Sequence, residues 1–362
     1  MRFLTFLVVF QFSSAYVSAQ TVTTSDSSQE KNGAVFFPVM YYTPETRIAV
    51  GAASLYFHQS LEQSNTSRPT AVTTDIIYTQ NKQITFEVSS DAFFTNGKYW
   101  HTGSFFYQKF PNQFYGIGNS TPDSAKENFT IEAVRINPTL LFRTSPHLFI
   151  GPQIHYEHWS FVDREPGKLL EQQTIQGSTS TTVSGIGTVV NYDERDNIFA
   201  PHTGRFYQAN FITSPKFLGS TSDFSRLKID LREYFNFSSS HVLAAQVVFH
   251  SSSGAVPFRF LPQLGGKNIL RGYFEGRYRD KNLLVAQSEY RSPFWWRFGF
   301  VVFGGVGDVA STIDKFNIRD LKISYGAGLR LAFIPEEFII IRLDYGIGQN
   351  SNGFYATINE AI

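Results

Sequence analysis

The sequence predicts an all-β protein that crosses a membrane as an antiparallel β-barrel of about sixteen strands. Three observations support this fold class: an export signal at the N-terminus, a succession of strand-length segments with alternating side chains, and the lack of a long apolar run after residue 19. A membrane-spanning helix needs about 18 consecutive apolar residues. A chain that crosses lipid on strands must close them into a barrel, because lipid offers no water to unpaired backbone groups.

The N-terminus has the pattern of a secretory signal peptide. Arg2 precedes the apolar run Phe3 to Phe12, and the small residues Val17, Ser18 and Ala19 follow. This order is typical of an export signal, with cleavage expected after Ala19, although a buried N-terminal strand or helix is the alternative. We therefore expect a signal peptide over residues 1–19, a short disordered lead over 20–33 and a barrel over 34–362.

The composition excludes several classes of protein. The 362 residues include 0 Cys, so an exported chain of this sequence has no disulfides. Its 31 basic and 30 acidic residues lack the basic excess of a nucleic-acid-binding protein. Phe and Tyr are abundant, at 37 and 18 residues, and aromatic side chains favour strands and membrane interfaces.

Alternation with a period of two residues identifies the strands. In the segment 321–334, Ile323, Tyr325 and Leu329 share one face, while Arg330 lies on the other. A soluble sandwich also alternates, but the polar faces here carry charges, which a water-filled lumen accommodates. These charges are Glu87, Asp91, Arg135, Glu157, Arg342 and Asp344. The predicted strands are 34–43, 47–59, 70–81, 83–94, 99–110, 129–143, 147–162, 180–192, 204–213, 222–237, 241–251, 282–292, 296–306, 321–334, 337–347 and 352–362.

The connections between these segments differ in length, as the short periplasmic turns and long external loops of outer-membrane barrels do. Tight connections lie at 81–82, 144–146 and 238–240, and long ones at 61–69, 113–128, 163–178 and 252–282.

The longest connection contains Leu264-Gly265-Gly266, Leu270-Arg271-Gly272-Tyr273 and Gly276-Arg277-Tyr278. With these motifs it resembles the inward-folding loop of the bacterial surface antigen superfamily. That superfamily comprises the barrels of BamA- and TamA-type assembly factors and of two-partner secretion transporters. Further family-like motifs are Tyr192-Asp193-Glu194-Arg195-Asp196-Asn197 with Pro201 and Gly204, Ser288-Glu289-Tyr290-Arg291, Gly326-Ala327-Gly328-Leu329-Arg330 and the last strand from Phe354 to Ile362.

The resemblance implies a role for the chain at the outer membrane of Gram-negative bacteria. It implies insertion or translocation of proteins or other macromolecules, with membrane lipid, client proteins or a separate periplasmic protein as partners. A passive pore plugged by its loop is the alternative, and a barrel enzyme is a remote one. We expect no cofactor and no nucleic-acid partner.

Two features depart from the family pattern. About a dozen residues separate the expected signal from the first strand, too few for the periplasmic POTRA domains of about 75 residues that relatives carry. In relatives, the thirteenth strand supplies an acid that contacts the loop arginine, and Gly305 stands at that place here. Arg271 therefore needs another partner.

We expect a lock between the loop and the barrel, formed by Arg271, Gly272, Tyr273 and Glu289. A guanidinium folded into a barrel needs a carboxylate, because an unpaired buried charge is costly. Glu289 is the first candidate on its strand's polar face, and Asp308 is the second. An ordinary solvated loop around Arg271 is the alternative.

No metal or catalytic site is expected. His155 and His158 point to opposite faces of a strand and cannot share an ion. His155 and Glu157 do share a face, and a polar pair in the lumen explains them. The sequence has no Gly-x-Ser-x-Gly nucleophile motif.

Overall fold

The computed structural model describes most of the expected barrel. The described residues are 31–59, 70–95, 97–198, 200–238, 241–334 and 339–362. The expected signal peptide and residues 20–30 of the expected lead lie outside them.

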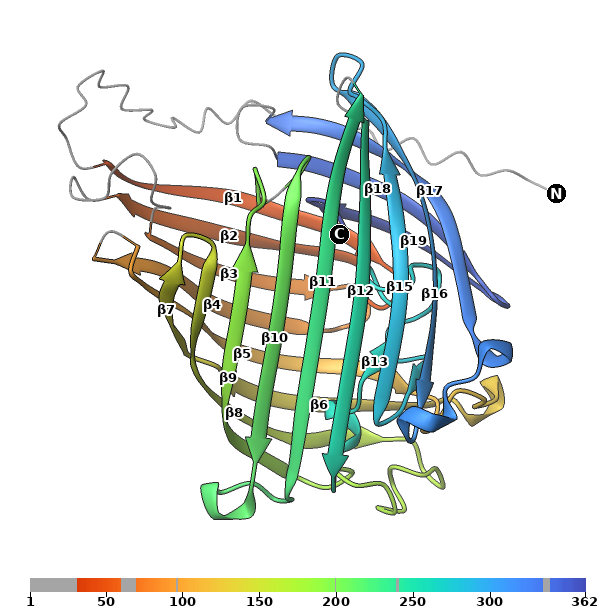
Figure 1. Cartoon of the computed structure of the whole chain (residues 1–362). Helices are drawn as coiled ribbons and strands as arrows, with labels where there is room; N and C mark the ends of the chain where they lie inside the picture. Colours follow the sequence, from red (N-terminus) through yellow and green to blue (C-terminus); the bar gives the residue numbers. More distant parts are fainter. Residues whose placement is uncertain (1–30, 60–69, 96, 199, 239–240, 335–338) are drawn as a thin grey trace.

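Seventeen strands form one antiparallel sheet that closes on itself where the last strand, β19, meets the first, β1 (Figure 1). Strands β6 and β7 share one position in the wall, because both pair with β5 on one side and β8 on the other. The wall therefore has sixteen positions, as the sequence predicts. The wall strands are β1 Lys31–Thr43, β2 Arg47–Gln59, β3 Thr70–Thr79, β4 Ile84–Phe94, β5 Tyr99–Phe114, β6 Glu127–Ile136, β7 Thr139–Ser145, β8 Leu148–Arg164, β9 Thr181–Asp193, β10 Gly204–Ser214, β11 Phe224–Ser238, β12 His241–Gly254, β15 Asn282–Arg291, β16 Phe298–Ala310, β17 Lys322–Ile334, β18 Ile339–Gly348 and β19 Ser351–Ile358.

Helical structure in the described residues is limited to five single turns of 3-10 helix. Their bounds are η1 Asp123–Ala125, η2 Lys216–Leu218, η3 Phe258–Phe260, η4 Ile313–Lys315 and η5 Ile318–Asp320. No helix in this part of the chain combines the length and apolar character needed to cross a membrane.

The sixth wall strand is interrupted at Asn137–Pro138, where the sequence predicted one continuous strand over 129–143. Proline has no backbone N–H to give to a strand ladder. The Asn137 side chain takes over part of the pairing, since its Oδ1 accepts from the backbone N–H of Ser104 at 2.8 Å. The strand is therefore interrupted at this point and resumes as β7.

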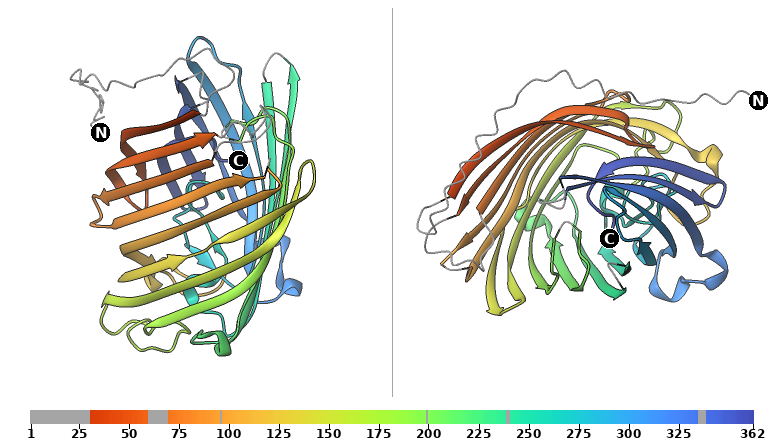
Figure 2. Two further views of the ribbon diagram at one scale, coloured as in Figure 1. Left: turned by 90° about the vertical axis from the view of Figure 1, so that its left-hand side faces the viewer. Right: turned by 90° about the horizontal axis from the view of Figure 1, so that it is seen from above.

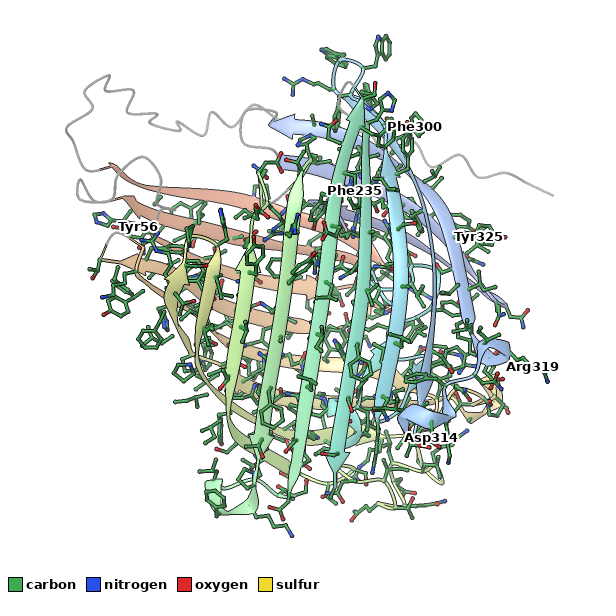
Figure 3. The ribbon with its side chains drawn as sticks, viewed as in Figure 1. Tyr56, Phe235, Phe300, Asp314, Arg319 and Tyr325 are labelled. Atoms are coloured by element: carbon green, nitrogen blue, oxygen red, sulfur yellow. The ribbon has the colours of Figure 1, made fainter. Side chains whose placement is uncertain are left out.

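Apolar side chains cover the outer face of the wall and polar ones the inner face. Tyr56, Phe235, Phe300 and Tyr325 are about half exposed, and Figure 3 places them on the outside of the strands. On β17, Arg330 points the other way and is buried. An apolar outer surface suits lipid, whereas a charged inner surface suits a polar lumen.

The connection between β12 and β15, residues 255–281, packs against the inner wall of the barrel (Figure 2). It contains the two-residue strands β13 Gln263–Leu264 and β14 Tyr278–Arg279, which pair with each other. One apolar cluster joins its first part to the wall, through Phe114, Phe129, Ile131, Ala133, Trp159, Leu170, Val183, Phe224, Val256, Phe258, Phe260 and Leu261. A second cluster joins its middle, through Val248, Leu264, Leu270, Tyr273, Leu283, Val285 and Val309.

Both ends of the barrel differ from the predicted strand limits. Strand β1 begins at Lys31, so residues 31–33 belong to the wall and not to the lead. Strand β19 ends at Ile358 instead of residue 362. Ala361 and Ile362 leave the wall and pack with the inward-facing Tyr234 and Ala244.

Candidate functional site

Arg271 in the loop 255–281 binds two carboxylates of the inner wall. Its Nη2 lies 2.6 Å from Oε2 of Glu289 on β15, and its Nη1 pairs with Oδ2 of Asp344 on β18. All three side chains are at most 2% exposed. A planar guanidinium can present its N–H groups to two acceptors at once, so one residue ties the loop to two strands.

The face of the same guanidinium stacks on an aromatic ring. The Arg271 guanidinium carbon lies 3.5 Å from the ring centroid of Phe303 on β16, a cation–π contact. Gly326 on β17 makes room for this ring, because a Cβ at that position would lie 2.5 Å from Cζ of Phe303. This accounts physically for one of the glycines in the Gly326-x-Gly328 motif.

The backbone on either side of Arg271 is held as firmly as its side chain. Gly272 has a φ of +114°, and a Cβ there would lie 2.8 Å from the backbone of Ile347. Its N–H donates to the hydroxyl of Tyr355 at 3.0 Å, and its carbonyl accepts from Ser351 Oγ at 2.6 Å. A side chain at position 272 would separate the loop from β18.

Tyr273 closes the contact on the next residue. Its hydroxyl donates to the carbonyl of Ile323 at 2.9 Å and accepts the N–H of Gln349 at 2.8 Å. Tyr273 is buried in the second apolar cluster, so its ring and its hydroxyl both fix the loop.

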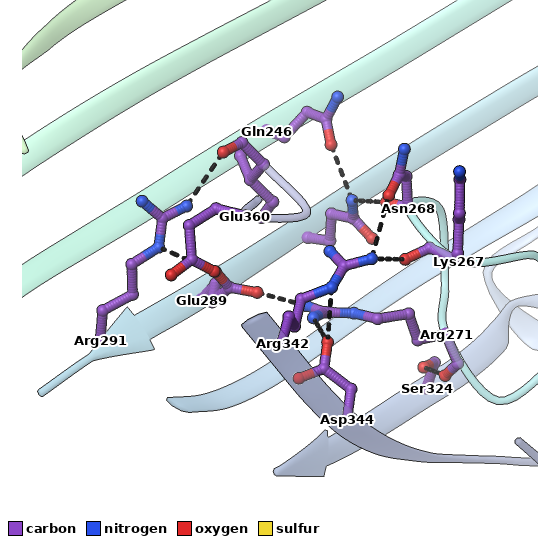
Figure 4. Close-up of polar contacts among 12 residues, drawn as sticks. Gln246, Lys267, Asn268, Arg271, Glu289, Arg291, Ser324, Arg342, Asp344 and Glu360 are labelled. Atoms are coloured by element: carbon purple, nitrogen blue, oxygen red, sulfur yellow. Dashed lines mark hydrogen bonds and ion pairs between the residues drawn. The ribbon is translucent and has the colours of Figure 1, made fainter. Parts of the chain in front are cut away.

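Further charged residues surround this contact and form one network (Figure 4). Arg291 Nε lies 2.8 Å from Oε1 of Glu289, and Arg330 Nη1 lies 2.6 Å from Oδ1 of Asp344. Arg330 Nε also lies 2.7 Å from Oε2 of Glu360, just beyond β19. We call this set the lock network; its members are Arg271, Glu289, Arg291, Arg330, Arg342, Asp344 and Glu360.

The structure explains how Arg271 manages without an acid at position 305. A Cβ on Gly305 would lie 2.6 Å from Cβ of Gln287 and 2.9 Å from Cδ2 of Leu270, so the loop occupies that space. The second carboxylate comes instead from Asp344. The sequence placed Asp344 on a polar face but gave no sign that it would meet Arg271.

Gly328 leaves room for this carboxylate. A Cβ at position 328 would overlap Oδ1 of Asp344, and it would lie 2.9 Å from Nη1 of Arg330. Both glycines of the motif thus clear space on β17, Gly326 for the stacking ring and Gly328 for the ion pair.

Asp308 is not a partner of Arg271, which corrects the second candidate from the sequence. Its Oδ1 accepts from Nδ2 of Asn119 at 3.3 Å and from the N–H of Val309 at 2.8 Å. It joins the loop after β5 to the wall.

The Asp193 motif forms the turn between β9 and β10. Arg195 and Asp193 form a bidentate ion pair, with Nε 2.8 Å from Oδ1 and Nη2 2.9 Å from Oδ2. Oδ1 of Asp196 accepts from the N–H groups of His202 and Thr203, and Gly204 has a φ of +99°.

This turn also contacts the lock network. The carbonyl of Pro201 accepts from Nη1 of Arg291 at 3.1 Å. Of the residues that the sequence singled out, Glu289 binds Arg271 directly, whereas Pro201 of this turn meets it only through Arg291 and Glu289.

The His155 and Glu157 side chains form a lumen pair, with Nε2 3.8 Å from Oε2. Glu157 also binds Arg259 of the loop at 2.7 Å. The described residues contain no group of three His, Cys, Asp or Glu side chains that could hold a metal ion.

The junction of β1 and β19, which we call the seam, is short. Within the described residues, one residue of β1 is paired with a residue of β19: Tyr42 with Ala356. By contrast, β1 has thirteen paired positions with β2, and β19 has eight with β18. The Tyr42 and Phe354 rings, 5.7 Å apart, add an aromatic contact at the seam.

Comparisons with known proteins agree with this geometry. Residues 55–362 match the sequence model of the Omp85 superfamily domain. No curated protein sequence matches the chain.

Many solved structures share the fold, among them the following three. BamA from Haemophilus ducreyi lacking POTRA domains 1-3 is 14% identical, with a TM-score of 0.63 over 91% of this chain and 70% of that one. CdiB from Acinetobacter baumannii is 11% identical, with a TM-score of 0.55 over 91% of this chain and 59% of that one. CdiB from Escherichia coli is 8% identical, with a TM-score of 0.57 over 90% of this chain and 62% of that one. The chain thus spans about three fifths of the length of either CdiB.

Proposed function

Because the chain belongs to the Omp85 superfamily, we propose that it inserts or translocates proteins or other macromolecules at the outer membrane, through an opening at the seam. In this proposal the barrel sits in outer-membrane lipid. Its clients arrive from the periplasm, alone or with a separate periplasmic protein.

The shortness of the seam is the observation that carries this proposal. Unpaired strand edges are templates for further strand pairing, and in lipid each unsatisfied backbone group costs several kcal/mol. Most of β1 has a paired neighbour in β2 but none in β19. An incoming strand that pairs with β1 would therefore satisfy backbone groups that the closed barrel leaves without a strand partner.

The lock network gives the seam a connection to the loop. Glu360 follows β19 by two residues and binds Arg330, which shares the Asp344 carboxylate with Arg271. Displacing the end of β19 would remove a carboxylate from this network. We propose that the lock network holds the loop in the lumen while the seam opens.

Disulfide trapping tests the seam directly, because the chain has 0 Cys of its own. Tyr42→Cys with Ala356→Cys would staple β1 to β19. Leu343→Cys with Ala356→Cys is the matched control, because Leu343 is the partner of Ala356 on β18 and that staple leaves the seam free.

The assay is depletion of the protein followed by quantitative outer-membrane proteomics, with each oxidised variant supplied in trans. We expect depletion to lower a set of client proteins, the control variant to restore them, and the seam-stapled variant to fail. Full restoration by the seam-stapled variant would exclude an opening at this place.

A passive barrel plugged by its loop is the second candidate, favoured by the two apolar clusters that pack the loop against the inner wall. It predicts no loss of other outer-membrane proteins on depletion. It also predicts that the seam staple changes nothing.

A further inference from the structure

A separate cavity of about 410 Å³ lies in the lumen between the loop 255–281 and the wall strands β8 and β10–β12. Its lining is rich in hydrogen-bond donors, three of them the cations Arg226, Lys228 and Arg259. Asn210 and His250 also belong to the lining. None of these residues belongs to the lock network.

The strand register brings three of these donors into one row. Asn210 on β10 pairs with Lys228 on β11, and Lys228 pairs with His250 on β12. Arg226 lies two residues from Lys228 on the same inner face of β11. Arg259 approaches from the loop, so the donors surround the cavity from the wall and from the loop.

The two cations on the inner face of β11, Arg226 and Lys228, have no close polar partner in the described part of the barrel. Within the described residues, the Arg226 and Lys228 side chains make no hydrogen bond and no ion pair. Nε of Arg226 and Nε2 of His250 are shielded from solvent and have no hydrogen-bond partner. Arg226 instead stacks on Phe260, 4.2 Å from the ring centroid, which leaves the N–H edge of its guanidinium available.

The nearby carboxylates are occupied by other cations. Glu157 binds Arg259 at 2.7 Å, and Asp230 binds Arg232 at 2.8 Å. Glu275 is the acid in the cavity lining itself, against the three cations Arg226, Lys228 and Arg259. The lining as a whole keeps an excess of positive charge.

We propose that this cavity binds an oxyanion of the phosphate class. Arg226 and His250 are half-buried and Lys228 is exposed to the lumen, and an oxyanion in the cavity would satisfy all three together through charge-assisted hydrogen bonds. The arginine fork and the lysine ammonium are the groups that proteins use to bind phosphate. The volume leaves space for an organic group on the phosphate, such as the glycerol part of a lipid headgroup.

Isothermal titration calorimetry tests this on the full barrel, refolded without lipid in a phosphate-free buffer with an uncharged detergent. Pyrophosphate and dihexanoyl phosphatidic acid are the two probes. Tighter binding of phosphatidic acid would identify a lipid headgroup as the ligand, and tighter binding of pyrophosphate a soluble phosphate. Either result supports the site, and added salt should weaken the binding.

The variant Arg226→Gln with Lys228→Gln should weaken binding about tenfold or more, the equivalent of losing one charge-assisted hydrogen bond. Lys322→Gln is the control, since it removes a positive charge from the inner face of β17, where Lys322 stacks on Tyr278 outside the cavity lining. If the double variant does not refold, Lys228→Gln alone takes its place. No saturable binding of either probe, or equal binding by cavity variant and control, would overturn the proposal.

Discussion

Replacing Arg271 by alanine should release the loop from the wall. The change removes two charge-assisted hydrogen bonds, to Glu289 and Asp344, each contributing about 1.5–3 kcal/mol. Neither carboxylate becomes an unpaired buried charge, because Arg291 remains 2.8 Å from Glu289 and Arg330 remains 2.6 Å from Asp344. We therefore expect a loss at the low end of the summed range, about 3–4 kcal/mol in the free energy of loop release.

A thiol reporter measures this release. Leu264 is fully buried in the second apolar cluster, so a Leu264→Cys thiol reacts with a maleimide only when the loop leaves the wall. When opening is rapid and reversible, the labelling rate follows the population of the open state. Arg271→Ala should raise that rate by about 100- to 1,000-fold, since 1.4 kcal/mol is a factor of ten. Phe217→Cys, 84% exposed on another loop, should label equally in both backgrounds.

An unchanged labelling rate at Leu264→Cys would refute the reasoning, because the two ion pairs would then contribute nothing to loop retention. A double-mutant cycle with Glu289→Gln isolates one of them. The combined effect should fall short of the sum of the single effects by about 1.5–3 kcal/mol. Strict additivity would mean that Arg271 and Glu289 act independently.

Three further predictions concern the wall and the export signal. Gly328→Ala should cost about 1–3 kcal/mol through overpacking against the Asp344 carboxylate. Gly299→Ala, with no neighbouring atom nearer than 3.6 Å to the added Cβ, should leave the thermal unfolding temperature unchanged. The folded barrel should migrate differently from the boiled one on a semi-native gel, and recovery in a soluble periplasmic fraction would contradict the fold. N-terminal sequencing of the mature protein should begin at Gln20, whereas a retained Met1 would argue against cleavage after Ala19.

The strands could be predicted from the sequence because their signal is local. The alternation of Ile323, Tyr325 and Leu329 with Arg330 needs no knowledge of the neighbouring strands. The break at Pro138 was the exception: the apolar pattern continues across it, and only the loss of one backbone donor interrupts the ladder.

The candidate site was predictable only in part, because its contacts depend on how distant strands line up. Glu289 could be predicted as the partner of Arg271 from the family-like motifs, and it follows Arg271 by only 18 residues. Asp344 lies 73 residues from Arg271. Its position along the barrel axis relative to Glu289 depends on the registers of three successive strand pairs, from β15 to β18. The sequence predicted that residues 359–362 would end the last strand. In the structure Glu360 binds Arg330, and the chain turns inward after Ile358.

The seam also bears on the order in which the barrel assembles. Every other junction joins neighbours along the chain, whereas Tyr42 and Ala356 are 314 positions apart (356 − 42). Contacts between such distant positions form late, because the entropy of closing the intervening chain must be overcome first. Successive hairpins can build the whole wall from β1 to β19 before this last step, which then adds one register pair. Strand pairing at the seam therefore contributes less to the folding free energy than strand pairing at any other junction of the wall.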